Sequence, residues 1–188
     1  MLSDSFEKIV NLLRINMNVP ALITGLLGVA LYLLCFQLKD AKAIIACKLV
    51  SSILYVVQYF LLSAFVGAAM DAAAFFGSYF AYKKDTAFIK KYKIPVIFLT
   101  VAVILTAGIV LYENPISILP IAGVLFETWA SWMEKERMIR IVSLLAVPCW
   151  LVYNFVSGAY GSAVGSVLAL ISILVALVRY SKSEKGKA

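Results

Sequence analysis

The chain has 188 residues, of which 63% are hydrophobic and 14% charged, with a mean hydropathy of +0.97 and a net charge of +7. A soluble domain carries about 45–50% apolar residues, so this composition excludes a water-facing surface and indicates a protein that crosses a membrane several times. The chain has no His, which removes the commonest general base and metal ligand. Its basic residues lie at the ends of apolar runs, which favours membrane orientation over nucleic-acid binding.

Residues 1–18 predict a short amphipathic helix at the membrane surface, before the first span. The apolar residues that share one face of this helix are Leu2, Phe6, Ile9, Val10, Leu13 and Met17. Asp4, followed three residues later by Glu7, resembles a capping box. These two acidic residues stand where a signal peptide would be basic, so we expect no cleaved signal.

Seven apolar segments follow, each close to the length of about 20 residues that a spanning helix needs. They are 19–37, 43–62, 66–83, 94–112, 115–133, 139–157 and 160–180. Two of the connections are very short, LLSAFVG after the second segment and VSGAYG after the sixth. Both contain Gly, which a sharp reversal of the chain tolerates.

Seven spans would divide the loops between two sides of the membrane, and nearly all basic residues fall on one of these sides. All of them except Lys8 and Arg14 fall in or beside the three longer loops or the C-terminal tail, 182–188. The short connections on the opposite side contain none. The positive-inside rule therefore predicts a multi-pass protein of the inner (cytoplasmic) membrane, with the C-terminus in the cytoplasm and the N-terminus outside.

The chain also repeats itself weakly at a shift of 95 residues. The shift superposes Tyr55 on Trp150, Phe60 on Phe155, Ala64 on Ala159, Ala68 on Ala163, Lys42 on Arg137 and Lys84 on Arg179. Each copy has an apolar span, a basic loop, a second span, a tight turn and a third span. Two such units of three spans face the same way only if an extra helix separates them.

These features predict an all-α membrane bundle of seven helices in a 3+1+3 arrangement. The units are 19–84 and 115–181, joined by a basic loop and a linker helix over 85–114. Because the units are parallel, an axis along the membrane normal relates them. Sugar transporters of the SWEET type have this arrangement.

Three short elements of the second half resemble the bacterial YgjV inner-membrane protein family. They are L-P-x-x-G (119–123), T-W-A (128–130) and C-W-x-x-x-N-F-x-x-G (149–158). The resemblance extends over nearly the whole chain after residue 18, and the family looks distantly related to SWEET and PQ-loop transporters. It implies an architecture and no particular substrate.

The resemblance to SWEET proteins also implies hinges at prolines within the spans. Pro120 and Pro148 fit this role in the second unit. The first unit has only Pro20, at the start of its first span, and the chain has no Pro-Gln dipeptide. The sequence therefore departs from the SWEET pattern in its first unit.

Asp71 is an acidic residue inside a predicted span, where a carboxylate costs about 2.5–3.5 kcal/mol on insertion scales. It lies about six residues inside the outer edge of its span, roughly 9 Å deep. At the repeat shift Ser166 takes its place, and Gln58 and Asn154 lie at similar depth, so the four residues predict a shared polar layer. Asp71 and Ser166 also match the positions where SWEET-like proteins place a polar residue at the substrate.

Tyr55 and Trp150 are repeat-related and lie one turn below this layer, where they would offer apolar platforms to a ring-shaped solute. Each assignment has a structural alternative. Tyr55 and Trp150 would serve core packing, Asp71 would join helices by hydrogen bonds, and Gln58 and Asn154 would be solvated near the interface. Glu127, nearer the cytoplasmic end of the fifth span, would couple transport to an ion, pair with Lys135 or Arg137, or extend to the surface.

The leading hypothesis is an alternating-access transporter that binds a small solute between its two units. The alternatives are a non-transporting scaffold or sensor in the same fold, and a vitamin-precursor transporter of the nicotinamide riboside type, for which more aromatic and Asn residues would be expected. We expect no enzyme, no metal and no cofactor, because no nucleophile–base pair or ligand spacing occurs. The expected partners are the lipid bilayer and the solute, with no nucleic acid; a homo-oligomer is left open.

Overall fold

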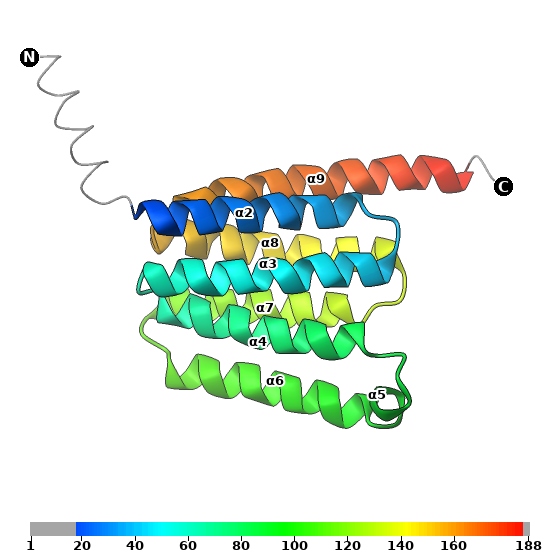
Figure 1. Cartoon of the computed structure of the whole chain (residues 1–188), viewed down its shortest axis with the longest axis horizontal. Helices are drawn as coiled ribbons and strands as arrows, with labels where there is room; N and C mark the ends of the chain where they lie inside the picture. The colour runs from blue at the N-terminus through cyan, green and yellow to red at the C-terminus, as the bar shows by residue number, and fades with distance from the viewer. Residues whose placement is uncertain (1–17, 186–188) are drawn as a thin grey trace, which may run out of the picture.

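The structure is a computed structural model that describes residues 18–185, with side chains up to Arg179. It is helical and contains no strand in this range, as predicted (Figure 1). Its elements are α2 (Val19–Gln37), α3 (Ala41–Leu61), α4 (Phe65–Tyr82), α5 (Ala87–Lys91), α6 (Lys93–Val110), η1 (Pro115–Ser117), α7 (Ile118–Ser131), α8 (Glu136–Val156) and α9 (Tyr160–Lys185). The helix predicted over 1–18 lies outside the described residues apart from Asn18. Helix α9 continues into the predicted tail, 182–188, because no helix breaker ends it before Lys185.

Side-chain caps begin the first two described helices. Asn18 accepts a hydrogen bond from the N–H of Ala21 at 3.1 Å, and Pro20 occupies the first turn of α2. Asp40 accepts from the N–H of Ala43 at 2.8 Å at the start of α3. Each cap satisfies one of the N–H groups that the first helical turn leaves without a partner, so local sequence sets where these helices begin.

The end of α2 is held by Arg140 of α8, which is fully buried. Its guanidinium donates to the carbonyl oxygens of Leu38 at 2.8 Å and Phe36 at 3.3 Å. The last carbonyls of a helix have no donor within that helix, so a buried guanidinium both satisfies them and ties α8 to α2. The positive-inside pattern counts Arg140 only as a loop charge, whereas the structure shows that it also packs.

The two tight turns have the same backbone geometry at repeat-related positions. The residue that reverses the chain has a left-handed conformation in each, Ser63 with φ 56° after α3 and Gly158 with φ 75° after α8. In both turns the following Ala donates its N–H to the carbonyl five residues earlier, at 2.9 Å. This is a Schellman ending, which favours Gly at the left-handed position. Both short connections contain Gly, but only Gly158 reverses the chain; in the first turn Gly67 lies inside α4 and Ser63 takes the left-handed conformation.

Because Ser occupies the left-handed position in the first turn and Gly in the second, we expect Ser63→Gly and Gly158→Ser to change the free energy of unfolding in opposite directions. Ser63→Gly should raise the free energy of unfolding by about 1 kcal/mol, because a side chain in the left-handed region costs roughly 1–2 kcal/mol and the added flexibility of Gly offsets part of that gain. Gly158→Ser should lower it by a similar amount. Reversible unfolding of the purified protein in mixed detergent measures both, and two changes of the same sign would contradict the assignment.

The helices form two groups of three, with α6 outside them. Helices α2, α3 and α4 pack side by side, and α7, α8 and α9 do the same. The groups meet where α2 packs against α9 and α4 packs against α7. Helix α6 lies along α4 and α7 at the edge of the bundle (Figure 1).

Residues at the repeat shift meet one another where the two groups face. Three side-chain hydrogen bonds join residues that are 95 positions apart: Tyr32 with Glu127, Lys48 with Ser143, and Tyr59 with Asn154. A residue can contact its own counterpart only near the axis that relates the two. The weak repeat in the sequence therefore corresponds to a line of direct contacts through the middle of the bundle.

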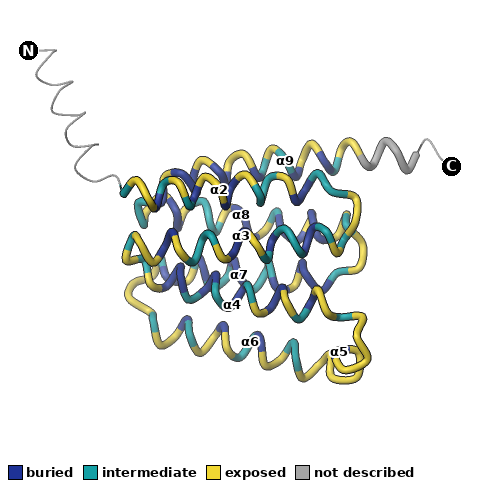
Figure 2. Tube along the Cα trace, in the orientation of Figure 1, coloured by how far each residue is buried: buried dark blue, intermediate teal, exposed yellow. Residues whose placement is uncertain are grey.

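Figure 2 shows exposed residues along the outer faces of the helices and buried residues between the helices. Large apolar side chains cover the outside, among them Ile94, Phe98 and Ile109 of α6, which are 79%, 75% and 74% exposed. The buried set includes charged and amide side chains: Lys48, Gln58, Asp71, Arg140 and Asn154. Because so large an apolar surface is unfavourable in water, the outside of the bundle is suited to lipid.

Five described helices are long and apolar enough to cross a membrane: α2, α3, α6, α8 and α9. They correspond to five of the seven predicted spans. The other two, 66–83 and 115–133, fall on α4 and on η1 with α7. Helix α4, which carries Asp71 and Ser78, is not among the five, and Pro115–Ser131 is a shorter apolar segment.

Candidate functional site

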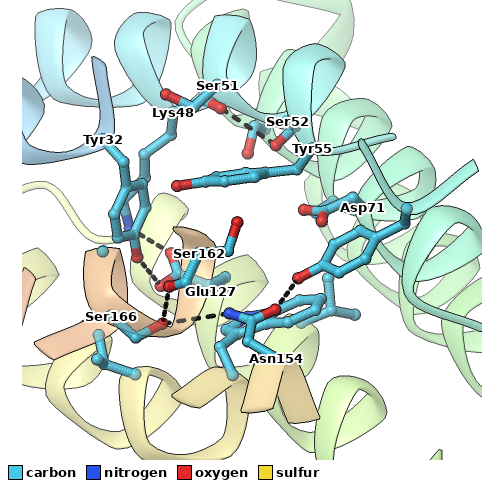
Figure 3. Close-up of a pocket in the computed structure, with 17 residues that line it drawn as sticks. Tyr32, Lys48, Ser51, Ser52, Tyr55, Asp71, Glu127, Asn154, Ser162 and Ser166 are labelled. Carbon is cyan, nitrogen blue, oxygen red and sulfur yellow. Dashed lines mark hydrogen bonds and ion pairs between the residues drawn. The ribbon is translucent and has the colours of Figure 1, made fainter. Parts of the chain in front are cut away.

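A cavity lies in the middle of the bundle, where the two groups of helices face each other (Figure 3). Its lining residues come from α2, α3, α4, α7, α8 and α9, and none comes from α6. The space open to the centres of water molecules is about 60 Å³. At roughly 10–15 Å³ for each water, this is room for about four to six waters or a solute of a few heavy atoms.

Helix α3 contributes a polar stripe to the cavity. Lys48, Ser51, Ser52, Tyr55 and Tyr59 all line it. Their spacing of three and four residues places them on one face of the helix. The other faces of α3 are apolar and partly exposed, so this stripe is the part of α3 that faces the cavity.

Lys48 and Glu127 form an ion pair at one side of the cavity. The pair is shielded from solvent, since the two side chains are 4% and 12% exposed. Lys48 also donates to the hydroxyl of Ser143 at 2.8 Å, and Tyr32 donates to Glu127 at 2.5 Å. The ammonium group of Lys48 and the carboxylate of Glu127 carry opposite charges, so the pair is neutral as a whole.

Asp71 has a different environment. Its side chain is 7% exposed and points into the open space beside Tyr55 (Figure 3). Among the described residues, no side chain or backbone group forms a hydrogen bond or ion pair with it, although Glu127 and Lys48 line the same cavity. A carboxylate within a membrane-spanning bundle is costly, and Asp71 is the charged lining residue that has no protein partner among the described residues.

A chain of hydrogen bonds crosses the cavity from α3 to α9. Tyr59 donates to the side-chain oxygen of Asn154, whose amide donates to Ser166 at 3.2 Å. Ser166 donates in turn to the backbone oxygen of Ser162 at 2.9 Å, and the Ser162 hydroxyl donates to Gln58 at 2.5 Å. These contacts link α3 of the first group to α8 and α9 of the second, and they order a polar wall of the cavity.

Aromatic rings form the remaining wall. Tyr59 stacks on Trp150 with 6.1 Å between ring centroids. The Tyr55 and Trp150 rings each lie against a glycine of the preceding helix: an added Cβ would come within 2.9 Å of Tyr55 at Gly28 and within 2.8 Å of Trp150 at Gly123. Both glycines therefore leave space that the rings occupy beside the cavity.

The structure brings most of the predicted site residues together. Asp71, Ser166, Asn154, Tyr55, Trp150 and Glu127 all line the cavity. Gln58 does not line it but is buried and bonded to Ser162, which does. The candidate hinges Pro120 and Pro148 lie near the start of α7 and inside α8, away from the lining.

The structure contradicts two of the structural alternatives. Glu127 pairs with Lys48 and Tyr32, and not with Lys135 or Arg137, because it lies on the face of α7 that turns inward. Gln58 and Asn154 are 1% and 3% exposed, so they are not solvated at an interface.

The sequence reasoning missed Lys48, which it counted among the loop charges. It also missed Tyr32, Tyr59, Ser52 and Ser162 as neighbours of the cavity. The signal was present as the polar stripe of α3, at helical spacing within an otherwise apolar span. For metal ions the described residues offer no group of three Cys, Asp, Glu or His side chains that could serve as ligands.

A helical bundle with an apolar outside and a buried polar cavity defines a polytopic membrane protein. The chain belongs to the Imp-YgjV family, described as bacterial inner membrane protein, which it matches over residues 20–184. It is therefore a multi-pass protein of the bacterial inner membrane.

Comparison with curated proteins identifies a relative, inner membrane protein YgjV of Escherichia coli (strain K12). The two are 29% identical over 91 residues, which cover 46% of this chain and 49% of the relative. The chain thus spans about half the length of the curated relative it matches. No solved structure matches the chain.

Proposed function

We propose that the protein is a transporter that moves a small solute through the cavity by alternating access. In this proposal α2–α4 and α7–α9 are two parallel three-helix units, α6 links them, and all seven helices span the membrane in a SWEET-like arrangement. The contacts between residues 95 apart, and the absence of α6 from the lining, support it. The positive-inside rule puts the C-terminus in the cytoplasm.

Asp71 is the observation that carries the proposal. A bundle held together only by its own packing would pair such a carboxylate with a donor or a cation from a neighbouring helix. The chain instead pairs every other charged lining residue and leaves Asp71 directed into open space. An unsatisfied charged group facing a cavity between two units is suited to a solute that supplies the missing partner.

Movement of one unit against the other would open the cavity to each side in turn. Pro148 lies inside α8, where it removes a backbone hydrogen bond of the helix, and Pro120 lies near the start of α7. Both residues belong to the second unit. The proposal therefore assigns most of the bending to α7 and α8, with α2–α4 moving as the more rigid unit.

Access from both sides of the membrane tests the proposal without knowledge of the solute. In a chain with Cys35, Cys47 and Cys149 replaced by Ala, a cysteine at Ala74 would lie in the cavity. We expect a small, membrane-impermeant thiol reagent to modify Ala74→Cys both in right-side-out and in inverted vesicles. Mass spectrometry of the purified protein measures the modified fraction in each.

The matched control is Ala130→Cys, because Ala130 is fully buried in an apolar cluster outside the cavity. It should remain unmodified in both kinds of vesicle. Modification of Ala74→Cys from one side only, or from neither, would contradict alternating access. Such a result would favour the second function, a scaffold or sensor in the inner membrane that uses the same bundle without transport.

A further inference from the structure

We propose that the solute bound in the cavity is a small protonated amine, held by Asp71 and by the aromatic wall. This inference rests on the proposed transport function and names the chemical class of its substrate. Four properties of the cavity support it: its charged side chains, its hydrogen-bonding groups, its rings and its size.

The cavity is lined by more acidic than basic side chains. The charged lining residues are Lys48, Asp71 and Glu127, and Lys48 is already paired with Glu127. Asp71 is therefore the acidic lining residue that has no cation beside it. A solute of charge +1 would supply that cation and stabilise the ionised carboxylate of Asp71, whereas an anion would place a second negative group beside it.

The serines of the cavity offer oxygen lone pairs more than protons. Four of the five lining serines donate their hydroxyl protons to the protein: Ser51 to the carbonyl of Cys47, Ser52 to that of Lys48, Ser166 to that of Ser162, and Ser162 to the Gln58 side chain. A hydroxyl that donates its proton can still accept hydrogen bonds. The wall thus presents acceptors that suit the N–H groups of an ammonium ion.

The rings beside Asp71 favour the same class. Tyr55, Tyr59 and Trp150 all line the cavity, and Tyr59 and Trp150 are stacked together. The face of an aromatic ring attracts cations, with Trp the strongest of the three types. A carboxylate combined with aromatic rings binds both the charge and the alkyl part of an organic ammonium ion.

The size of the cavity limits the solute to a few heavy atoms in this conformation. Its volume of about 60 Å³ corresponds to roughly four to six water positions. An alkylammonium ion with three or four carbon atoms fits this space, whereas a disaccharide does not.

Three probes of equal size and different charge test the inference on the purified full-length chain. Propylammonium chloride, propan-1-ol and sodium propionate are each titrated at constant ionic strength, and the midpoint of thermal unfolding is followed. A ligand that binds only the folded state raises this midpoint in a saturable way. We expect a saturable rise with propylammonium and none with the alcohol or the carboxylate.

Substitutions in the cavity test whether propylammonium binds there. Asp71→Asn should weaken propylammonium binding about 10-fold or more, since a hydrogen bond to a charged group is replaced by one to a neutral amide. Trp150→Leu should weaken it by about 3-fold to 10-fold. The matched controls are Glu113→Gln and Trp129→Leu, because Glu113 and Trp129 are exposed and lie outside the cavity; both should bind as the unaltered chain does.

Each contrary result has a separate meaning. A rise with propan-1-ol or propionate that depends on Asp71 would overturn the amine inference and leave the binding site in place. Binding of propylammonium that Asp71→Asn leaves unchanged would also overturn it. If no probe binds, the amine inference fails, while access of Ala74→Cys from both sides would still support transport.

Discussion

Replacing Lys48 by Met is expected to lower the free energy of unfolding by about 3–5 kcal/mol. The substitution keeps most of the volume of the side chain but leaves Glu127 as a buried charge without its cation, and breaking a buried ion pair from one side has this effect. Tyr32 would remain as a donor to Glu127 and offset part of the loss. Reversible unfolding of the purified protein in mixed detergent measures the change.

The exposed pair of Lys42 and Asp85 provides the matched control. Their side chains are 53% and 52% exposed, and the charged atoms lie 2.7 Å apart. Lys42→Met should change the free energy of unfolding by no more than about 1 kcal/mol, since water solvates the remaining carboxylate. A loss at Lys48 no larger than the loss at Lys42 would show that Glu127 is not held as a buried charge.

The double variant Lys48→Met with Glu127→Gln distinguishes the charge from the contacts. It removes both charges, so it should be more stable than Lys48→Met alone by about 1–3 kcal/mol. If the loss of stability in the double variant, relative to the unaltered chain, equals the sum of the losses in Lys48→Met and Glu127→Gln, the two residues do not interact and the ion pair is not what stabilises this part of the bundle.

Gly165→Ala is expected to lower the free energy of unfolding by about 1–3 kcal/mol. Gly165 of α9 faces α2, and an added Cβ would lie 2.1 Å from a methyl group of Val29 and 3.0 Å from its Cβ. Val29 is buried and β-branched, so its side chain cannot rotate away and the two helices would have to separate. The same unfolding measurement in mixed detergent detects the loss.

A compensating substitution tests this explanation. Val29→Ala removes the methyl groups that the new Cβ would meet, so Gly165→Ala combined with Val29→Ala should recover most of the stability lost in Gly165→Ala. Gly161→Ala on the same helix is the control, since the nearest atom to its Cβ would be the end of the flexible Leu22 side chain, at 3.1 Å, and its other contacts would be ordinary ones at 3.9 Å. A double variant less stable than Gly165→Ala would contradict the close approach of α2 and α9.

The polar layer shows what residue spacing can predict and what it cannot. Asp71 and Asn154 could be placed at similar depth from the sequence, because helix rise converts residue number into depth. Their partners could not be predicted in this way. Asn154 bonds to Tyr59 and Ser166, whereas Asp71 bonds to neither Ser166 nor any other described residue. Depth is a property of each helix, but hydrogen bonding depends on how neighbouring helices are rotated.

The conformation of the first tight turn could not be predicted from its local sequence either. Its sequence contains Gly67, and a sharp reversal of the chain tolerates Gly, but the sequence does not say which residue makes the turn. In the structure Ser63 takes the left-handed conformation, and Gly67 gives its space and its N–H to Tyr153 of α8, at 2.9 Å to the hydroxyl. Gly67 is required because it packs against Tyr153, which lies 86 residues further along the chain. The sequence around Gly67 does not reveal such a contact.

The sequence by itself determined the helical class, the five helices long enough to span, the membrane location and the repeat. These follow from local causes: a backbone in lipid must form its own hydrogen bonds, which selects helices, and the length of an apolar run then selects the spans. Only the tertiary structure decided that Lys48 is an inner residue paired with Glu127, 79 positions away, and that Asp71 is left without a partner. Such pairings depend on which helix faces meet, and apolar faces of similar composition do not specify this in the sequence of a single helix.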